Sequence, residues 1–131
     1  MLTPLLEGLR DSAVVNLGSA VTMVVDDSPF SLELTMQSLL GFGIQTRWPC
    51  HSAPEAMEIL KEHTIDLLII DVEMPGVDGV ELVHWLRRSG LDPNAFVPVI
   101  MTGAHVRKDK VAKVRDSGAN FLLTKPFSAT S

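Results

Sequence analysis

Acidic, hydroxyl and basic side chains stand at the ends of several apolar runs in this sequence, where they are able to act together. They are Asp26 and Asp27 after the first run, Asp71 at the end of a later one, Thr102 after the next, and Lys125 near the end of the chain. Three carboxylates that converge on a partly dry cleft repel one another, and a hard divalent cation with oxygen ligands keeps them ionised at the lowest cost. The set therefore predicts a Mg²⁺ site built from Asp26, Asp27 and Asp71, and not a Cys/His transition-metal site.

Asp71 is the residue of this set that is able to carry covalent chemistry. A carboxylate beside Mg²⁺ acts as a nucleophile toward phosphorus, because the ion offsets the repulsion between the attacking anion and the phosphoryl oxygens. Lys125 offers a point charge to one phosphoryl oxygen, and the Thr102 hydroxyl offers a hydrogen bond to another. Each residue alone is common at strand ends and helix caps, so the prediction of phosphoryl transfer to Asp71 depends on the whole set.

Short apolar runs alternate with segments of helical periodicity, and these elements must position the polar side chains. The predicted strands are Val21–Asp26, Ile44–Trp48, Ile65–Asp71, Val97–Met101 and Asn120–Leu123. This alternation predicts an α/β fold with a parallel sheet that helices cover on both faces. In such a sheet ligands collect outside the carboxyl ends of the strands, which is where the polar residues stand.

Helix starts are well marked between the predicted strands. Ser28 precedes a proline and predicts an N-cap with a preset first turn, and Ser52 with Glu55 has capping-box spacing. Asp78 marks the start of a third helix, and a fourth is expected over about residues 106–117. Strand and helix therefore alternate from the first strand to the fifth.

Composition limits the classes of function that this chain can have. A length of 131 residues with 46% hydrophobic and 21% charged residues fits one packed domain. The net charge of -5 argues against direct contact with nucleic acid, which relies on clustered basic residues. Cys50 is the only cysteine, so no internal disulfide is expected and a cytoplasmic location is favoured. No apolar run approaches the ~20 residues that span a bilayer, so no membrane partner is expected.

Four segments, in order, resemble the motifs of the response regulator receiver domain, the CheY-like family. They are Val24-Val25-Asp26-Asp27-Ser28, Ile69 through Gly79, Pro98 through Thr102, and Gly118-Ala119 through Lys125-Pro126-Phe127. The resemblance covers about residues 21–127. It implies a flavodoxin-like, three-layer sandwich whose five-stranded parallel sheet has the order 2-1-3-4-5.

The resemblance also implies a role for each site residue in a two-component signal transduction system. Asp71 resembles the phosphoacceptor, which takes a phosphoryl group from a sensor histidine kinase or a phosphotransfer protein and then switches partner interactions. Such a domain is a signalling phosphoacceptor and not an enzyme, apart from catalysing its own phosphorylation and dephosphorylation. The other implied roles are direct Mg²⁺ binding by Asp27, binding of the ion through water by Asp26, a backbone carbonyl ligand from Glu73, the switch hydroxyl of Thr102 and the phosphate-binding ammonium of Lys125.

The two ends of the chain depart from the family pattern. We expect residues 1–19 to form a partly helical N-terminal extension, and residues 20–131 to form a receiver domain whose C-terminal fifth helix is missing or replaced. An N-terminal leucine stripe with helical spacing is a candidate to cover the vacant face, in its own chain or in a homodimer. A fragment cut before its last helix is the competing interpretation. The stripe consists of Leu2, Leu5, Leu6 and Leu9.

Two features beside Lys125 also follow from the resemblance. Leu122 occupies the position of the family's aromatic switch residue, and Phe121 lies one residue earlier, on the other face of a strand. Either Leu122 simply packs at the strand edge, or the effect of phosphorylation is transmitted by a different mechanism from the usual one. A cis peptide bond is expected between Lys125 and Pro126, because the family commonly has one there.

Two other functions share part of this pattern. A flavodoxin-like protein that binds FMN has the same sheet topology, but here the first strand leads into acidic residues instead of a phosphate-binding loop rich in hydroxyls and glycine. A magnesium-dependent aspartyl-phosphate phosphatase also uses an Asp nucleophile, with a second acid that would correspond to Glu73. Asp71-Val72-Glu73 lacks the threonine that follows in that class. Both alternatives are weaker than the receiver interpretation.

Overall fold

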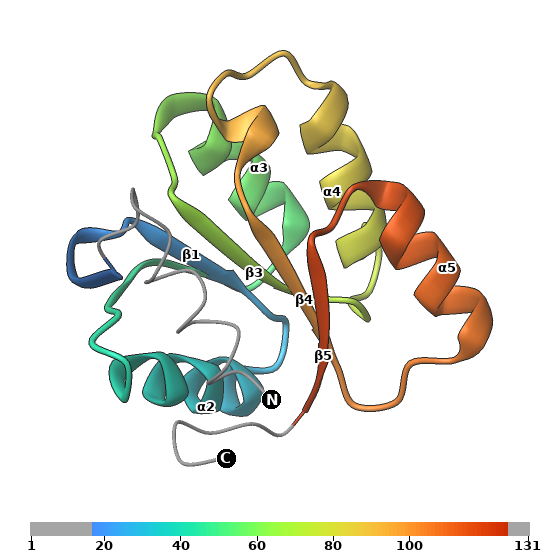
Figure 1. The fold of residues 1–131 in the computed structure, drawn as a ribbon, viewed down its shortest axis with the longest axis horizontal. Coiled ribbons are helices and arrows are strands. Elements are labelled where there is room, and N and C mark those ends of the chain that lie inside the picture. Colours follow the sequence, from blue (N-terminus) through green and yellow to red (C-terminus); the bar gives the residue numbers. More distant parts are fainter. Residues whose placement is uncertain (1–16, 126–131) are drawn as a thin grey trace.

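The computed structural model describes residues 17–125, and these form a parallel sheet with helices on both faces (Figure 1). The strand order β2-β1-β3-β4-β5 confirms the predicted topology. The leucine stripe, the Lys125–Pro126 peptide and the segment of the expected fifth helix lie outside the described residues. The strands are β1 (Thr22–Val25), β2 (Thr46–Cys50), β3 (Leu67–Asp71), β4 (Val99–Gly103) and β5 (Phe121–Thr124).

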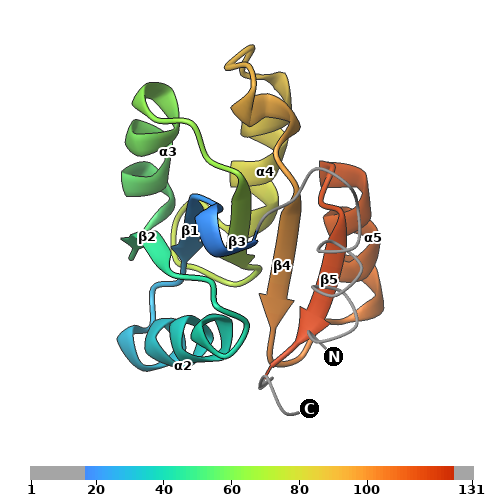
Figure 2. The same cartoon turned by 60° about the vertical axis from the view of Figure 1, so that its left-hand side comes forward.

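The central strands are buried on both faces, as expected for a parallel sheet between helices. Neighbouring residues point to opposite faces, so Ile70 packs in one core and Ile69 in the other. Figures 1 and 2 show α3, α4 and α5 on one face of the sheet and α2 on the opposite face. The core that contains Ile70 includes residues of α3, α4 and α5. The apolar runs of the sequence therefore form the two cores that hold the strand ends in place.

Within the described residues, four α-helices and the short 3-10 turn η2 lie between the strands, and a second 3-10 turn, η1, precedes β1. Three helices begin where the sequence predicted, because Ser28, Ser52 and Asp78 each accept a hydrogen bond from a backbone N–H in the first turn. The fourth, expected from about residue 106, begins at Lys108 without a side-chain cap. None of these helices is long and apolar enough to cross a membrane. The bounds are η1 (Leu17–Ser19), α2 (Pro29–Leu40), α3 (Ala53–Glu62), α4 (Gly79–Arg88), η2 (Asn94–Phe96) and α5 (Lys108–Ser117).

The predicted end of β3 at Asp71 is confirmed, whereas the other predicted strand bounds were wrong by one or two residues, with β2 and β4 shifted by two residues at both ends. The Ile44 N–H donates to the Leu39 carbonyl at the end of α2, so this residue does not begin the ladder and β2 starts at Thr46. The Ile65 N–H is likewise bound by the Asn94 side chain, and β3 starts at Leu67. Backbone groups that pair outside the sheet therefore set both strand starts.

Candidate functional site

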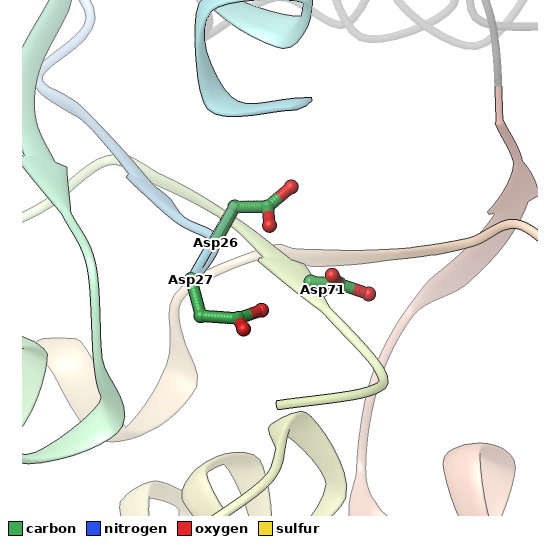
Figure 3. A group of neighbouring side chains, drawn as sticks. All are labelled: Asp26, Asp27 and Asp71. Carbon is green, nitrogen blue, oxygen red and sulfur yellow. The ribbon is translucent and has the colours of Figure 1, made fainter. Parts of the chain in front are cut away.

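Three carboxylates meet at the carboxyl end of the sheet (Figure 3). Asp26 and Asp27 follow β1 and Asp71 ends β3, which pairs directly with β1. One carboxylate oxygen from each residue lies within 4.8 Å of the others. Asp26 and Asp71 are buried and Asp27 is exposed. The structure thus brings together the three acidic residues that the sequence singled out, two of them buried and one open to solvent.

Backbone N–H groups fix the orientation of the two buried carboxylates. The Ser28 N–H donates to Asp26 Oδ1 at 3.0 Å, and the Glu73 N–H donates to Asp71 Oδ1 at 3.1 Å. Each bond closes a local turn between residues two positions apart, which is a common arrangement for Asp at the end of a strand. One oxygen of each carboxylate is thereby held by its own loop, and the Oδ2 atoms remain for other partners.

Lys125 supplies the positive charge at this site. Its Nζ lies 2.9 Å from Asp26 Oδ2, 3.2 Å from Asp71 Oδ2 and 2.7 Å from Ser31 Oγ. The backbone of Lys125 is anchored by a hydrogen bond from its N–H to the Gly103 carbonyl at the end of β4. The sequence predicted the lysine but not Ser31, whose only sequence signal is its place in the helical turn after the acidic pair.

The two buried carboxyl groups have pKa values that depart in opposite directions. Burial raises the pKa of Asp26, but hydrogen bonds from Ser31, Lys125 and the Ser28 N–H outweigh it, so the pKa lies below its usual value. Burial also raises the pKa of Asp71, and the Glu73 N–H and Lys125 do not compensate, so that pKa lies above its usual value. Asp71 is thus the carboxylate that would gain more from a further positive charge.

The pKa of Lys125 itself is raised. Burial lowers it, but the hydrogen bond to Asp26 and the charges of Asp71 and Asp26 outweigh the burial. The ammonium group therefore stays protonated beside the two carboxylates throughout the physiological range of pH.

Thr102 lies directly beside Asp71 in the sheet. The two residues are register partners in the β3–β4 pair, and the Val72 N–H donates to the Thr102 carbonyl at 2.9 Å. Thr102 is only 2% exposed. Glu73, in contrast, is exposed, with its N–H on the Asp71 carboxylate. The five polar residues first singled out, together with Glu73, therefore surround the end of β3.

Leu122 and Phe121 on β5 face different surroundings. Leu122 packs partly buried against the core beneath α3, α4 and α5, and its other neighbour Leu123 packs against the core on the α2 side. Phe121 is 42% exposed. The position of the family's aromatic switch is therefore filled by a partly buried aliphatic side chain, while the aromatic ring next to it meets solvent.

The chemistry of this donor set suits a hard cation and a phosphoryl group. Carboxylate oxygens are ligands that Mg²⁺ prefers, and the cation would reduce the repulsion among the three acids. Lys125 is close enough to Asp71 to contact a group attached to that carboxylate. The site can thus hold a divalent ion and stabilise negative charge on Asp71.

Comparison with known proteins identifies one family. The family model described as "Response regulator receiver domain" matches residues 22–131. The polar-differentiation response regulator DivK from Brucella anthropi is 28% identical over 106 residues, which cover 81% of this chain and 84% of that protein.

Solved structures of receiver domains have the same fold. The signal receiver domain of a signal transduction histidine kinase from Syntrophus aciditrophicus is 30% identical, with a TM-score of 0.74, covering 86% of this chain and 83% of that chain. The chemotaxis response regulator CheY4 of Vibrio cholerae is 26% identical, with a TM-score of 0.74, covering 85% of this chain and 90% of that chain.

Proposed function

The chain belongs to the response regulator receiver domain family, and from this premise we propose that Asp71 accepts a phosphoryl group from a histidine kinase or a phosphotransfer protein. The observation that carries the proposal is the position of Asp71. Its carboxylate lies within 4.8 Å of two other carboxylates and 3.2 Å from the Lys125 ammonium. The family match favours this function over flavin binding and over phosphatase activity.

Each side chain of the site has a separate role in the proposed phosphoryl transfer. An Asp71 carboxylate oxygen forms a bond to phosphorus while the bond from phosphorus to the donor's imidazole nitrogen breaks, and the imidazole leaves with the electron pair. Lys125 faces negative charge that develops on one phosphoryl oxygen, and the Thr102 hydroxyl donates to another. Catalysis by this domain would be limited to its own phosphorylation and dephosphorylation.

We propose Mg²⁺ as the cation of the site. The ligands would be the carboxylates of Asp27 and Asp71, Asp26 through water, and the Glu73 carbonyl. The bound ion would supply charge neutralisation between the attacking carboxylate and the phosphoryl oxygens. The fit of the acidic cluster supports the assignment, because three mutually close oxygen donors with a raised pKa at Asp71 favour a hard cation.

The first turns of α2 offer a surface on which a phosphodonor could dock. Phe30 and Leu34 are 75% and 47% exposed, and their i, i+4 spacing puts them on one side of the helix. Phe30 lies three residues after Asp27, so a helical partner that packs on this part of α2 would be close to the acidic pair. We therefore place the donor on this side of the domain.

A cytoplasmic location is part of the same proposal, supported by the free thiol of Cys50.

The test is phosphorylation by a small acyl phosphate in the presence of Mg²⁺. The wild-type chain should gain one phosphoryl group, and both a chelator and Asp71→Asn should abolish the gain. Asp92→Asn is the matched control, because Asp92 is an exposed aspartate in the turn before η2, at the opposite end of the sheet from the site. Full phosphorylation of the Asp71→Asn variant would reject the assignment.

A further inference from the structure

All three N–H groups of the Lys125 ammonium have an acceptor in this structure. A lysine side chain has three donors, and here they face Asp26 Oδ2 at 2.9 Å, Asp71 Oδ2 at 3.2 Å and Ser31 Oγ at 2.7 Å. The shortest of the three contacts is to the neutral hydroxyl of Ser31. The lysine is thus held from three directions, with a side chain that is only 17% exposed.

The fold fixes both ends of the contact between Ser31 and Lys125. Ser31 lies in the first turn of α2, where its own N–H donates to the capping Ser28 Oγ at 3.2 Å. The backbone of Lys125 is held by the hydrogen bond from its N–H to the Gly103 carbonyl. The two residues are 94 positions apart in the chain, so the contact joins the first helix after the acidic pair to the residue that directly follows β5.

The three acceptors differ in what happens to them when Asp71 is modified. A phosphoryl group on Asp71 converts its carboxylate into a neutral acyl group, and the N–H that pointed to Asp71 becomes available to a phosphoryl oxygen. The N–H groups toward Asp26 and Ser31 are left in place. Ser31 carries no charge, so it holds the ammonium without neutralising it, which leaves the positive charge of Lys125 for the incoming group.

We infer that Ser31 is a positioning residue for Lys125, because its hydroxyl holds the ammonium group in reach of Asp71 and of a phosphoryl group bound there. This inference rests on the proposed function of Asp71 and Lys125. It adds to the site a residue of α2, the same helix whose exposed face we assign to the phosphodonor.

The test compares Ser31→Ala with Ser31→Thr, which restores a hydroxyl, and with Ser38→Ala. Ser38 is the matched control, because its Oγ bonds to the Leu34 carbonyl within the same helix, away from the site. The rate of phosphorylation by acetyl phosphate with Mg²⁺ should fall about 3- to 10-fold in Ser31→Ala, the loss expected for one hydrogen bond of ordinary net strength. Ser31→Thr should recover most of the rate, and Ser38→Ala should match the wild type.

A spectroscopic measurement separates positioning from simple loss of stability. In the wild type the Lys125 ammonium should give a resolved ¹H–¹⁵N signal, because its bonds slow rotation and exchange with water. Ser31→Ala should broaden or remove this signal, and Ser31→Thr should retain it. If the rate falls in Ser31→Ala while the signal is unchanged, the effect comes from another contact of Ser31, such as its bond to Asp26, and the inference is rejected. An unchanged rate in a folded Ser31→Ala variant rejects it as well.

A further variant, Lys125→Ala, distinguishes failure of this inference from failure of the proposed function. If the wild type is phosphorylated, Lys125→Ala is slow and Ser31→Ala behaves as the wild type, only the role of Ser31 is wrong. If the wild type takes no phosphoryl group on Asp71, or if Lys125→Ala reacts as fast as the wild type, the proposed function of these residues fails first.

Discussion

Asp26 and Asp71 share the Lys125 ammonium but differ in the number of their other hydrogen-bond donors. Asp26 also receives bonds from Ser31 and from the Ser28 N–H, and the pKa of Asp26 is lowered although burial raises it. Asp71 has the Glu73 N–H and faces the negative charge of Asp26, and burial keeps the pKa of Asp71 raised. The residue with the less compensated charge is the one proposed as nucleophile, and this is where a cation would contribute most.

Cys50 provides a residue-scale prediction about pH. Burial, with a smaller contribution from Glu55, raises the pKa of its thiol from 9.0 to about 12. The folded state therefore binds a proton that the unfolded state loses, and this contribution to stability is present below pH 9 and lost as the pH rises toward about 12. At pH 8 the thiolate fraction should be about a thousandfold lower than in the unfolded chain.

Alkylation by iodoacetamide checks this directly. We expect very slow labelling of Cys50 in the folded protein and rapid labelling in urea, with Cys50→Ala as the control for specificity. Equal rates in the two states would show that the thiol is accessible and ionised in the fold.

Gly79 provides a second residue-scale prediction, because it allows α4 to begin directly against the end of β3. A Cβ at this position would collide with the Asp71 carbonyl oxygen. We expect Gly79→Ala to lower the free energy of unfolding by about 1–3 kcal/mol, as overpacking commonly does. The control is Gly103→Ala, where the nearest atom belongs to the Val106 side chain, which is able to adjust. Urea denaturation in which Gly79→Ala is no less stable than Gly103→Ala would contradict this account.

At the scale of elements, ion pairs and caps hold the loops at both ends of the sheet. Asp78 caps α4 through a bond from the Glu81 N–H to Oδ1 at 3.0 Å, and its Oδ2 contacts Lys110 Nζ at 2.9 Å. The loop after Asp71 is thereby tied to α5. At the opposite end, Arg87 on α4 donates to the carbonyls of Ala95 and Gly118 and to the Asn120 side chain.

Substitutions at Asp78 separate the cap from the ion pair. Asp78→Asn keeps an oxygen that can cap the helix and removes the charge that faces Lys110, so we expect a loss of less than about 1 kcal/mol. Asp78→Ala removes both and should cost about 1 kcal/mol more. Lys110→Met should resemble Asp78→Asn. If urea denaturation gives equal losses for the Asn and Ala variants, the cap does not contribute as described.

The guanidinium group of Arg87, which donates to three acceptors, should be difficult to replace. Arg87→Lys keeps the positive charge but cannot reach three acceptors in the same geometry, and we expect a loss of about 1–3 kcal/mol. Arg88→Lys is the matched control, because Arg88 is the exposed neighbour on the same helix. In thermal denaturation the midpoint of Arg87→Lys should be clearly lower than that of Arg88→Lys. Equal midpoints would refute the stabilising role of the Arg87 guanidinium group.

The elements also show which parts of the structure could be predicted from the sequence. Helix starts were predictable at Ser28, Ser52 and Asp78, because a cap involves residues only three positions apart. The start of β2 was not, because it depends on the bond between the Ile44 N–H and the Leu39 carbonyl. The role of Ser31 was also not predictable, since its partner Lys125 lies 94 residues further along the chain, directly after β5.

At the scale of the whole molecule, the site exists only when the sheet is complete. β1 lies between β2 and β3, so the acidic pair meets Asp71 although the two are separated by a strand and two helices in the chain. Asp26 and Lys125 are 99 residues apart and still form an ion pair at 2.9 Å. Periodicity alone predicted a parallel sheet, and the resemblance to receiver domains supplied its strand order, because local patterns do not encode which strands become neighbours.

The central claim is that Asp71 carries the phosphoryl group, and chemical trapping tests it most directly. After phosphorylation by acetyl phosphate with Mg²⁺, borohydride reduces an aspartyl phosphate to homoserine, and peptide mass spectrometry then locates the modified residue. We predict homoserine at position 71 and at no other aspartate, with none formed when Mg²⁺ is chelated. Homoserine at Asp26 or Asp27 in place of Asp71, or trapping that persists in Asp71→Asn, would contradict it.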